Sequence, residues 1–232
     1  MKGARFSRCL SALLLGFACL PGQSLGGAIQ GKVVFVGAAP APKKVPVLID
    51  QYLCGAEKDA EDLVLSPKKE IRNTVAWIEN PPANAAWPAQ TKKVEMDQKG
   101  CVYIPRMVVV PAGGTVDFLN NDRLLHNIHS HSKLNIPFNL TQPKNRTIPI
   151  TFAKPEIVRI VCDMHPWMLS WVVVAAHPFY AVTGADGQFA FDNLPPGKYI
   201  LQVWHERLGT VPASVTVDDK QPARVTVEMK LP

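Results

Sequence analysis

The sequence predicts an all-β protein built from β-sandwiches, and three observations support this. Short runs rich in Val, Ile and Phe recur along the chain and are interrupted by Gly, Pro and Asn. The 21 prolines are spread over the whole length, and Pro disfavours the interior of helices. No apolar stripe at helical spacing has a useful length. A chain of 232 residues is therefore expected to form one large or two small β domains.

Residues 1–26 are predicted to be a secretory signal peptide. They contain three early basic residues, an apolar run from 10 to 20 and small residues before Gly27. The run is too short to span a membrane, and no later segment reaches that length. We therefore expect an exported protein, periplasmic or extracellular, with no membrane span.

Charge and cysteine content narrow the possibilities further. The net charge of +6 falls by three when the basic residues of the leader are removed, and this balance gives no sign of nucleic-acid binding. Outside the leader, three of the five cysteines remain: Cys54, Cys101 and Cys162. An odd number in an exported chain indicates one disulfide and one thiol with another role. A lipid anchor at Cys19 is a weaker alternative, because Gly16 stands where Leu is usual.

The first half of the chain contains a series of short β-type runs. Strands are expected at 29–36, 45–49, 73–79, 93–96, 102–104, 107–110 and 115–119. Residues 38–44 indicate a turn or linker and 81–90 a loop. Residues 51–62 are expected to form a loop or a short helix around Cys54.

Three potential metal ligands follow one of the later strands. Cys162, His165 and Met168 share one short loop, and His126 lies in an Asn-rich loop about forty residues earlier. Two imidazoles, a thiolate and a weak thioether are the ligands of a blue-copper electron-transfer site. The Cys-x-x-His-x-x-Met spacing lets one loop turn around a single ion, and Pro166 stiffens that turn.

Strand periodicity directs both ligand loops toward one core. In the run 156–162, Arg159 faces outward and the inward face carries Val158, Ile160 and Cys162. In the run 115–120, which leads to the loop with His126, one face carries Val116, Phe118 and Asn120. The two loops are therefore expected to open at the same end of a β-sandwich.

These two segments resemble the copper-ligand segments of the cupredoxins, and the short spacing with Pro after His is most similar to the amicyanin type. The resemblance covers about residues 100–176. It implies a Greek-key β-sandwich with one copper ion in a type 1 site. Its equatorial ligands would be His126, Cys162 and His165, with Met168 as the axial ligand. It also implies that Asn127 ties the two ligand loops together through hydrogen bonds. Cys54 and Cys101 then remain as the disulfide pair.

Each of these residues also has a more ordinary interpretation, and other kinds of metal site fit the sequence less well. A single buried Cys is usually a small apolar core residue, and a single Met is usually packing. A c-type haem needs Cys-x-x-Cys-His, which is not present in the sequence. A structural zinc site usually has two or more Cys, and only Cys162 is nearby. The four ligands together favour copper.

The pattern changes after residue 176. Residues 169–176 form a nearly continuous apolar run, expected to be a closing strand that is buried on both faces. Residues 183–204 then alternate around two Gly turns, with the patterns Asp-Gly-x-Phe-x-Phe and Leu-x-Pro-Gly-x-Tyr. They resemble the carboxypeptidase regulatory-like β-sandwich over about 180–230. That resemblance implies a packing and interaction module without catalysis.

Four domain ranges follow from these patterns. The signal peptide at 1–26 precedes a β segment at 27–99, which is expected to be part of the copper-binding sandwich or packed on it. The copper-binding core spans 100–177, and the small C-terminal β-sandwich spans 178–232. The strand that starts at Ala28 is also a candidate to complete that small sandwich.

The remaining histidines have more ordinary expected roles. His129 and His131 should share the strand face opposite His126, as surface residues, a second weaker copper site or a contact for a redox partner. His177 and His205 lie where strands meet turns and are expected to be structural hydrogen-bonding groups.

An apolar patch is expected around an exposed edge of His165, formed by Leu124, Leu125, Pro166 and Trp167. Such a patch suits a transient redox encounter.

The expected function is one-electron transfer by an exported copper protein that meets a transient redox protein partner. The alternatives are a copper-binding or copper-delivery protein without redox turnover, and a structural β-sandwich with a vestigial site. No catalytic triad or convincing pair of carboxylates suggests an enzyme.

Overall fold

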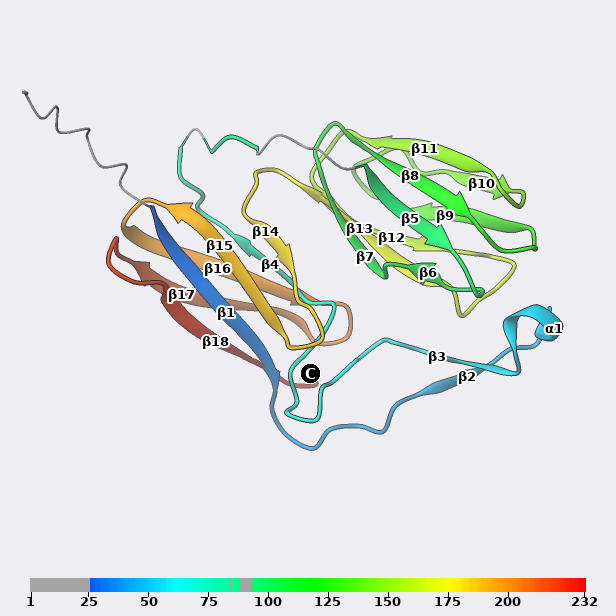
Figure 1. Ribbon diagram of the computed structural model, residues 1–232, viewed down its shortest axis with the longest axis horizontal. Coiled ribbons are helices and arrows are strands. Elements are labelled where there is room, and N and C mark those ends of the chain that lie inside the picture. The colour runs from blue at the N-terminus through cyan, green and yellow to red at the C-terminus, as the bar shows by residue number, and fades with distance from the viewer. Residues whose placement is uncertain (1–25, 84, 88–92) are drawn as a thin grey trace, which may run out of the picture.

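The computed structural model describes residues 26–83, 85–87 and 93–232, and it is all-β, as predicted (Figure 1). Two β-sandwiches lie side by side. A long excursion of the chain leaves one sandwich, reaches the far end of the other and returns. In the described part of the chain the one helix is α1 (Gln51–Cys54). This helix is too short to cross a membrane, and the described residues contain no longer apolar helix that could do so. The predicted signal peptide falls almost wholly outside the described residues.

The sandwich that contains the predicted metal ligands, which we call the metal-site sandwich, consists of two sheets. One has the strand order β10-β9-β12-β13-β7 and the other β11-β8-β5-β6. The strands are β5 (Val94–Gln98), β6 (Tyr103–Ile104), β7 (Met107–Pro111), β8 (Gly114–Asn120), β9 (His126–His131), β10 (Asn139–Gln142), β11 (Thr147–Phe152), β12 (Glu156–Val161) and β13 (Leu169–Ala175). Their inward side chains form one apolar core between the two sheets, which includes Val116, Phe118, Ile128, Val158, Ile160 and Val172.

Alternation along β8 and β12 places the ligand loops as the sequence predicted. On β12, Val158 and Ile160 are buried and Arg159 is exposed, so Cys162 continues the inward face. On β8, the inward face carries Val116, Phe118 and Asn120. Antiparallel β9 pairs with β12 and begins at His126. Both ligand segments therefore meet at one end of the sandwich.

The second sandwich also has two sheets, with the strand orders β15-β1-β18 and β14-β4-β16-β17. Its strands are β1 (Gly27–Phe35), β4 (Val75–Ile78), β14 (Tyr180–Val182), β15 (Gln188–Leu194), β16 (Gly197–His205), β17 (Gly209–Val217) and β18 (Ala223–Met229). Of the segment 27–99, β1 and β4 pair with strands of this second sandwich, β1 in the way considered for the strand that starts at Ala28, and β5 pairs within the other sandwich. The five strands after residue 176 are too few to complete two sheets. Strand β1 adds to one sheet by pairing with β18, and strand β4 adds to the other by pairing with β16.

Strand β13 is buried on both faces, as its continuous apolar sequence predicted. Val172 and Val174 face the core of the metal-site sandwich. Val173 faces the other way, into a smaller cluster with residues of both sandwiches, among them Val75, Trp77, Met107, Tyr180 and Trp204. A buried ion pair between Arg106 and Glu206 crosses the same boundary. The two sandwiches are therefore packed against each other along β13.

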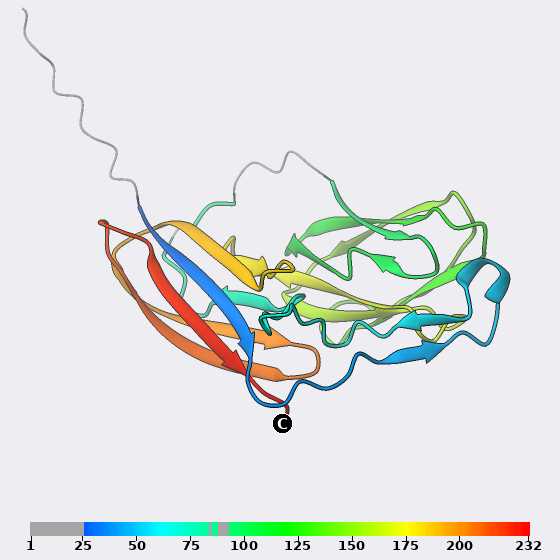
Figure 2. The same ribbon diagram turned by 60° about the horizontal axis from the view of Figure 1, so that its bottom comes forward.

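The excursion between β1 and β4 contains a small hairpin that we call the arm, residues 44–59. It comprises β2 (Lys44–Pro46), α1 and β3 (Glu57–Asp59), which pairs with β2. Both its flanking strands belong to the second sandwich, but Figure 2 shows that the arm reaches the end of the metal-site sandwich. Val47 and Cys54 are buried in the core of that sandwich. The arm therefore packs on a domain to which its flanking strands do not belong.

Candidate metal centre

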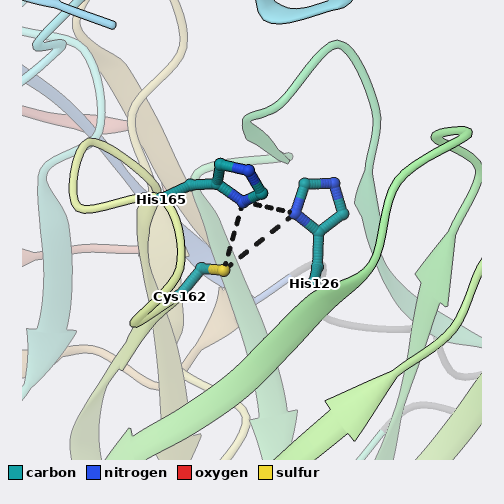
Figure 3. Close-up of side chains that lie close together, drawn as sticks. All are labelled: His126, Cys162 and His165. Carbon is teal, nitrogen blue, oxygen red and sulfur yellow. Dashed lines mark hydrogen bonds between the residues drawn. The ribbon is translucent and has the colours of Figure 1, made fainter. Parts of the chain in front are cut away.

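Three of the four predicted ligands converge in the structure (Figure 3). The Nδ1 atoms of His126 and His165 are 2.9 Å apart. The Sγ atom of Cys162 lies 3.5 Å from Nδ1 of His165 and 4.0 Å from Nδ1 of His126. All three side chains are buried. Together they form a cluster that can hold a metal ion.

Met168 closes the loop that carries two of these ligands. Its backbone N–H donates to the carbonyl of His165 at 2.8 Å, and its carbonyl accepts from the N–H of Cys162 at 3.3 Å. The side chain of Met168 is fully buried. The loop is thus a compact turn held at both ends, with its thioether inside the protein.

Hydrogen bonds from neighbouring residues join the two ligand segments. The backbone N–H of Asn127 points at Cys162 Sγ at 3.5 Å. The side-chain oxygen of Asn127 accepts from the N–H of Asp163 at 2.7 Å. The buried hydroxyl of Tyr103 donates to the carbonyl of Asn127 at 2.9 Å and contacts that of Val161 at 3.2 Å. These bonds hold β9 and β12 in a fixed relation around the sulfur.

Each histidine also contacts a carboxylate through its outer nitrogen. Nε2 of His126 donates to Asp122 at 2.9 Å, and Nε2 of His165 donates to Asp50 at 3.1 Å. A carboxylate on the outer nitrogen fixes the ring and leaves the other nitrogen free for a metal. Both Nδ1 atoms are therefore presented to the centre of the cluster.

Neither carboxylate was identified from the sequence. Asp122 stands four residues before His126 in the same Asn-rich loop, so its proximity could have been inferred from the spacing. Asp50 lies more than a hundred residues from His165, and no local pattern marks it. Its role depends on the position of the arm, which is a property of the whole fold.

The charged state of the pocket follows from these contacts. Burial alone would lower the pKa of His126, but its hydrogen bonds to Asp122 and Cys162 outweigh this and raise the pKa to about 9. Burial, helped by the nearby His126, lowers the pKa of His165, although Asp50 opposes it. Burial would raise the pKa of Asp122, but His126 and two backbone N–H groups lower it. Because two Nδ1 lone pairs at 2.9 Å repel each other, a proton or a cation must lie between them.

The spacing of the three ligand atoms fits one small ion. Metal–nitrogen bonds of about 2.0–2.1 Å and a metal–sulfur bond of about 2.3 Å would separate the ligand atoms by roughly 3.5–3.8 Å in a plane. The observed distances of 2.9 and 4.0 Å lie on either side of that range, and the distance of 3.5 Å lies at its lower limit. Side-chain shifts of about half an ångström would therefore accommodate the ion.

The expected exposed edge of His165 is not found. Its ring is 0% exposed, because Asp50 covers the outer nitrogen and Trp167 packs beside it with ring centroids 5.2 Å apart. Of the predicted patch, Trp167 and Leu124 are buried, and only Pro166 and Leu125 are exposed. The prediction failed because it left out the arm. Apolar side chains on the arm, Leu48, Ile49, Tyr52 and Leu53, are exposed instead.

The other histidines lie outside this centre. His129 and His131 point to the face opposite His126, as predicted, with ring centroids 4.4 Å apart. Nδ1 of His129 bonds to Asp163 at 2.9 Å, and Arg159 is the strand partner of His131. They do not belong to any three-ligand cluster among the described residues.

His177 and His205 have the structural role expected for them. Nδ1 of His177 accepts from the N–H of Phe179 at 3.3 Å, and Nδ1 of His205 accepts from the N–H of Arg207 at 3.2 Å.

The disulfide joins Cys54 to Cys101, the pair expected from the sequence, and leaves Cys162 as a free, buried thiol. Cys54 lies on the arm, and both cysteines are buried in the core of the metal-site sandwich. The indole N–H of Trp167 donates to the carbonyl of Cys101 at 2.9 Å. The bond thus attaches the arm beside the ligand loop.

Comparison with known proteins finds both resemblances expected from the sequence. The family model of the carboxypeptidase regulatory-like domain matches residues 171–230. Among solved structures, a purple cupredoxin from Nitrosopumilus maritimus is 22% identical, with a TM-score of 0.32, over 36% of this chain and 100% of its own. Amicyanin from Paracoccus versutus is 23% identical, with a TM-score of 0.33, over 43% of this chain and 97% of its own.

A copper-containing nitrite reductase from Thermus scotoductus SA-01 is also similar, at 24% identity and a TM-score of 0.35 over 41% of this chain. This chain matches only 25% of the length of that enzyme. No curated protein matches the chain. With TM-scores below 0.5, the functional assignment depends on the ligand geometry.

Proposed function

We propose that this protein is an exported carrier of single electrons, with one copper ion in a type 1 site formed by His126, Cys162, His165 and Met168. The observation that carries the proposal is the convergence of two Nδ1 atoms and one thiol sulfur in a buried pocket. Copper bound there supplies a one-electron couple between Cu(I) and Cu(II). The trigonal His₂Cys set with a weak Met ligand is the arrangement that blue-copper sites use.

The protein's own groups suit a site that changes charge without changing shape. Asp122 and Asp50 hold the two imidazole rings, and the Asn127 N–H points at the sulfur of Cys162. A hydrogen bond to a ligating sulfur and the exclusion of water both tune the potential of a metal site. Because these groups are fixed by the fold, little rearrangement is needed when an electron arrives or leaves.

The burial of the ligands favours a resident ion over copper delivery. A delivery protein must present its ion to the ligands of a recipient, whereas all four proposed ligands here lie inside the protein. A redox partner needs only close approach. It would meet the arm at this end of the molecule, because the arm covers His165.

Export is part of the proposal and has two supports. The leader predicted for residues 1–26 directs secretion, and the Cys54–Cys101 disulfide suits an oxidising compartment. The partner is proposed to be another one-electron redox protein, and the protein itself to be a carrier without an enzymatic reaction.

A redox titration distinguishes the carrier from a delivery protein. Copper-loaded protein is titrated with mediators while its visible absorption and its bound copper are both measured. A carrier should bleach and recover reversibly in a one-electron step, with the ion retained in both states. Loss of copper on reduction would instead support delivery.

A further inference from the structure

The arm contributes an acidic side chain to a site that belongs to another domain. Asp50 stands immediately before α1, and its carbonyl accepts the N–H groups of Leu53 and Cys54 at 3.0 and 2.9 Å. Its backbone has φ 56° and ψ 30°, in the left-handed region. Asp and Asn tolerate this region better than most residues. The tight turn directs the carboxylate of Asp50 inward, 3.1 Å from Nε2 of His165.

Three further contacts hold the arm in this position. Val47 is fully buried in the core of the metal-site sandwich. The disulfide attaches Cys54 to Cys101. Lys58 donates from Nζ to the carbonyl of Gly100 at 2.7 Å. Because the arm is anchored on both sides of Asp50, the carboxylate has little freedom to leave His165.

The disulfide also connects the carboxylates of the two histidines. Asp122, which binds His126, accepts hydrogen bonds from the N–H groups of Gly100 and Cys101 at 2.6 and 2.8 Å. Asp50 lies in the turn that contains Cys54. One covalent bond therefore fixes the segments that hold both imidazole rings.

We propose that Asp50 is a positioning residue for the metal site, and that the arm is the wall that closes it. Asp50 keeps the proton of His165 on Nε2 and so presents Nδ1 to the ion. The arm covers the ring of His165, so a bound ion can exchange with solvent only when the arm moves. The inference rests on the proposed metal site and adds to it a residue of the arm, which lies between two strands of the second sandwich.

The test compares variants that tolerate the left-handed backbone of Asp50. Asp50→Gly removes the carboxylate, and Asp50→Asn retains an oxygen that can accept a hydrogen bond from Nε2. Gly and Asn both tolerate the left-handed region, so neither variant has the strain of a β-branched or bulky residue. Asp59→Asn is the matched control, because Asp59 is an exposed carboxylate of the same arm that pairs with Lys44. An intact disulfide and an unchanged melting curve verify the fold of each variant.

The first readout is Co²⁺, which reports binding by its visible spectrum and needs no redox step. Loss of a residue that hydrogen-bonds to a metal-ligating histidine typically weakens metal binding about 10–100-fold. We expect that loss for Asp50→Gly, together with faster transfer of Co²⁺ to EDTA. Asp50→Asn should lose less of its affinity for Co²⁺, and Asp59→Asn should bind Co²⁺ as tightly as the wild type. Equal affinity and equal transfer rates in Asp50→Gly and the control would overturn the proposal.

The second readout uses the metal-free protein and therefore does not depend on the proposed function. Nitrogen NMR of the imidazoles should show His165 protonated on Nε2, with a slowly exchanging proton. In Asp50→Gly that proton should exchange faster, and the Nδ1–H tautomer should appear. An unchanged His165 signal would reject Asp50 as a positioning residue, even in a protein that binds no metal. Absence of Co²⁺ and copper binding in the wild type would reject the metal site separately.

Discussion

At the scale of single residues, the proposed metal site depends on how Cys162, His126 and His165 face one another. A buried thiol alone is ordinary packing. Two imidazoles that direct their Nδ1 atoms at each other and at the same sulfur are not ordinary packing, because their lone pairs repel unless a cation or a proton lies between them. The carboxylates on the outer nitrogens preserve this arrangement. The chemistry therefore resides in the shared orientation of the three side chains.

Met168 is predicted to tune the site without creating it. Met168→Leu should leave a coloured copper protein with a higher reduction potential, because a weak thioether donor that stabilises Cu(II) is lost. The buried side chain is replaced by one of similar volume, so the stability cost should stay below about 1.5 kcal/mol. Spectra and a potentiometric titration of both proteins check this. A lower potential, or loss of the colour, would contradict the axial role of Met168.

At the scale of elements, the strands that present the ligands were predictable and the arm was not. Alternating apolar residues fix which side of β8 and β12 faces the core, since the side-chain period of a strand is two. Cys162 could be assigned to the inward face on that basis, whereas His126 was chosen from its loop and Asn127 from the resemblance to the cupredoxins. The position of Asp50 depends on a chain excursion from a different sandwich, and local sequence contains no information about that path.

The disulfide is predicted to stabilise both the fold and the site. Cys54 and Cys101 are 47 residues apart, for which the chain-entropy model gives about 4 kcal/mol. The double variant Cys54→Ser/Cys101→Ser should unfold at lower urea concentration and bind metal more weakly, because the arm is no longer attached. Urea unfolding and a metal titration, each compared with Asp59→Asn, measure the two effects. Full metal affinity in the double variant would show that the arm does not need the bond.

At the scale of the whole molecule, the two sandwiches form a connected unit. β1 and β4 precede the metal-site sandwich in the sequence but pair with strands that follow it. Arg106 and Glu206 form two hydrogen bonds of 2.7 and 3.1 Å across the boundary, with side chains 8% and 9% exposed. The sequence showed where the β character changes at residue 177. It could not show that the chain crosses between the sandwiches, because strand pairing is decided by long-range contacts.

The Arg106–Glu206 pair gives a test of this boundary. Glu206→Leu alone should destabilise the protein by about 3–5 kcal/mol, because it leaves a buried guanidinium without its partner. The double variant Arg106→Met/Glu206→Leu should recover most of that loss, since both charges are removed. Denaturant unfolding of the two variants and the wild type gives the comparison. Equal stability of the two variants would mean that the pair is not buried in solution.

His205, close to the same boundary, predicts a pH dependence. Burial, and then the charge of Arg106, lower its pKa from 6.5 to about 4. The unfolded chain therefore binds more protons than the folded one between these values, so stability falls as the pH drops below about 6.5. Between pH 7 and pH 5 the loss should be about 2 kcal/mol. In His205→Gln, the difference between the unfolding free energies at pH 7 and pH 5 should be smaller than in the wild type by about 2 kcal/mol. The same pH dependence in both proteins would contradict the role assigned to His205.

The most direct test of the copper site is the visible spectrum after one equivalent of Cu(II) is added to the metal-free protein. The trigonal His126, Cys162 and His165 set should give an intense sulfur-to-copper charge-transfer band. Cys162→Ser should bind copper without that band, because an oxygen ligand cannot supply the transition. A colourless copper complex in the wild type, or the same spectrum in Cys162→Ser, would contradict a type 1 site at this position.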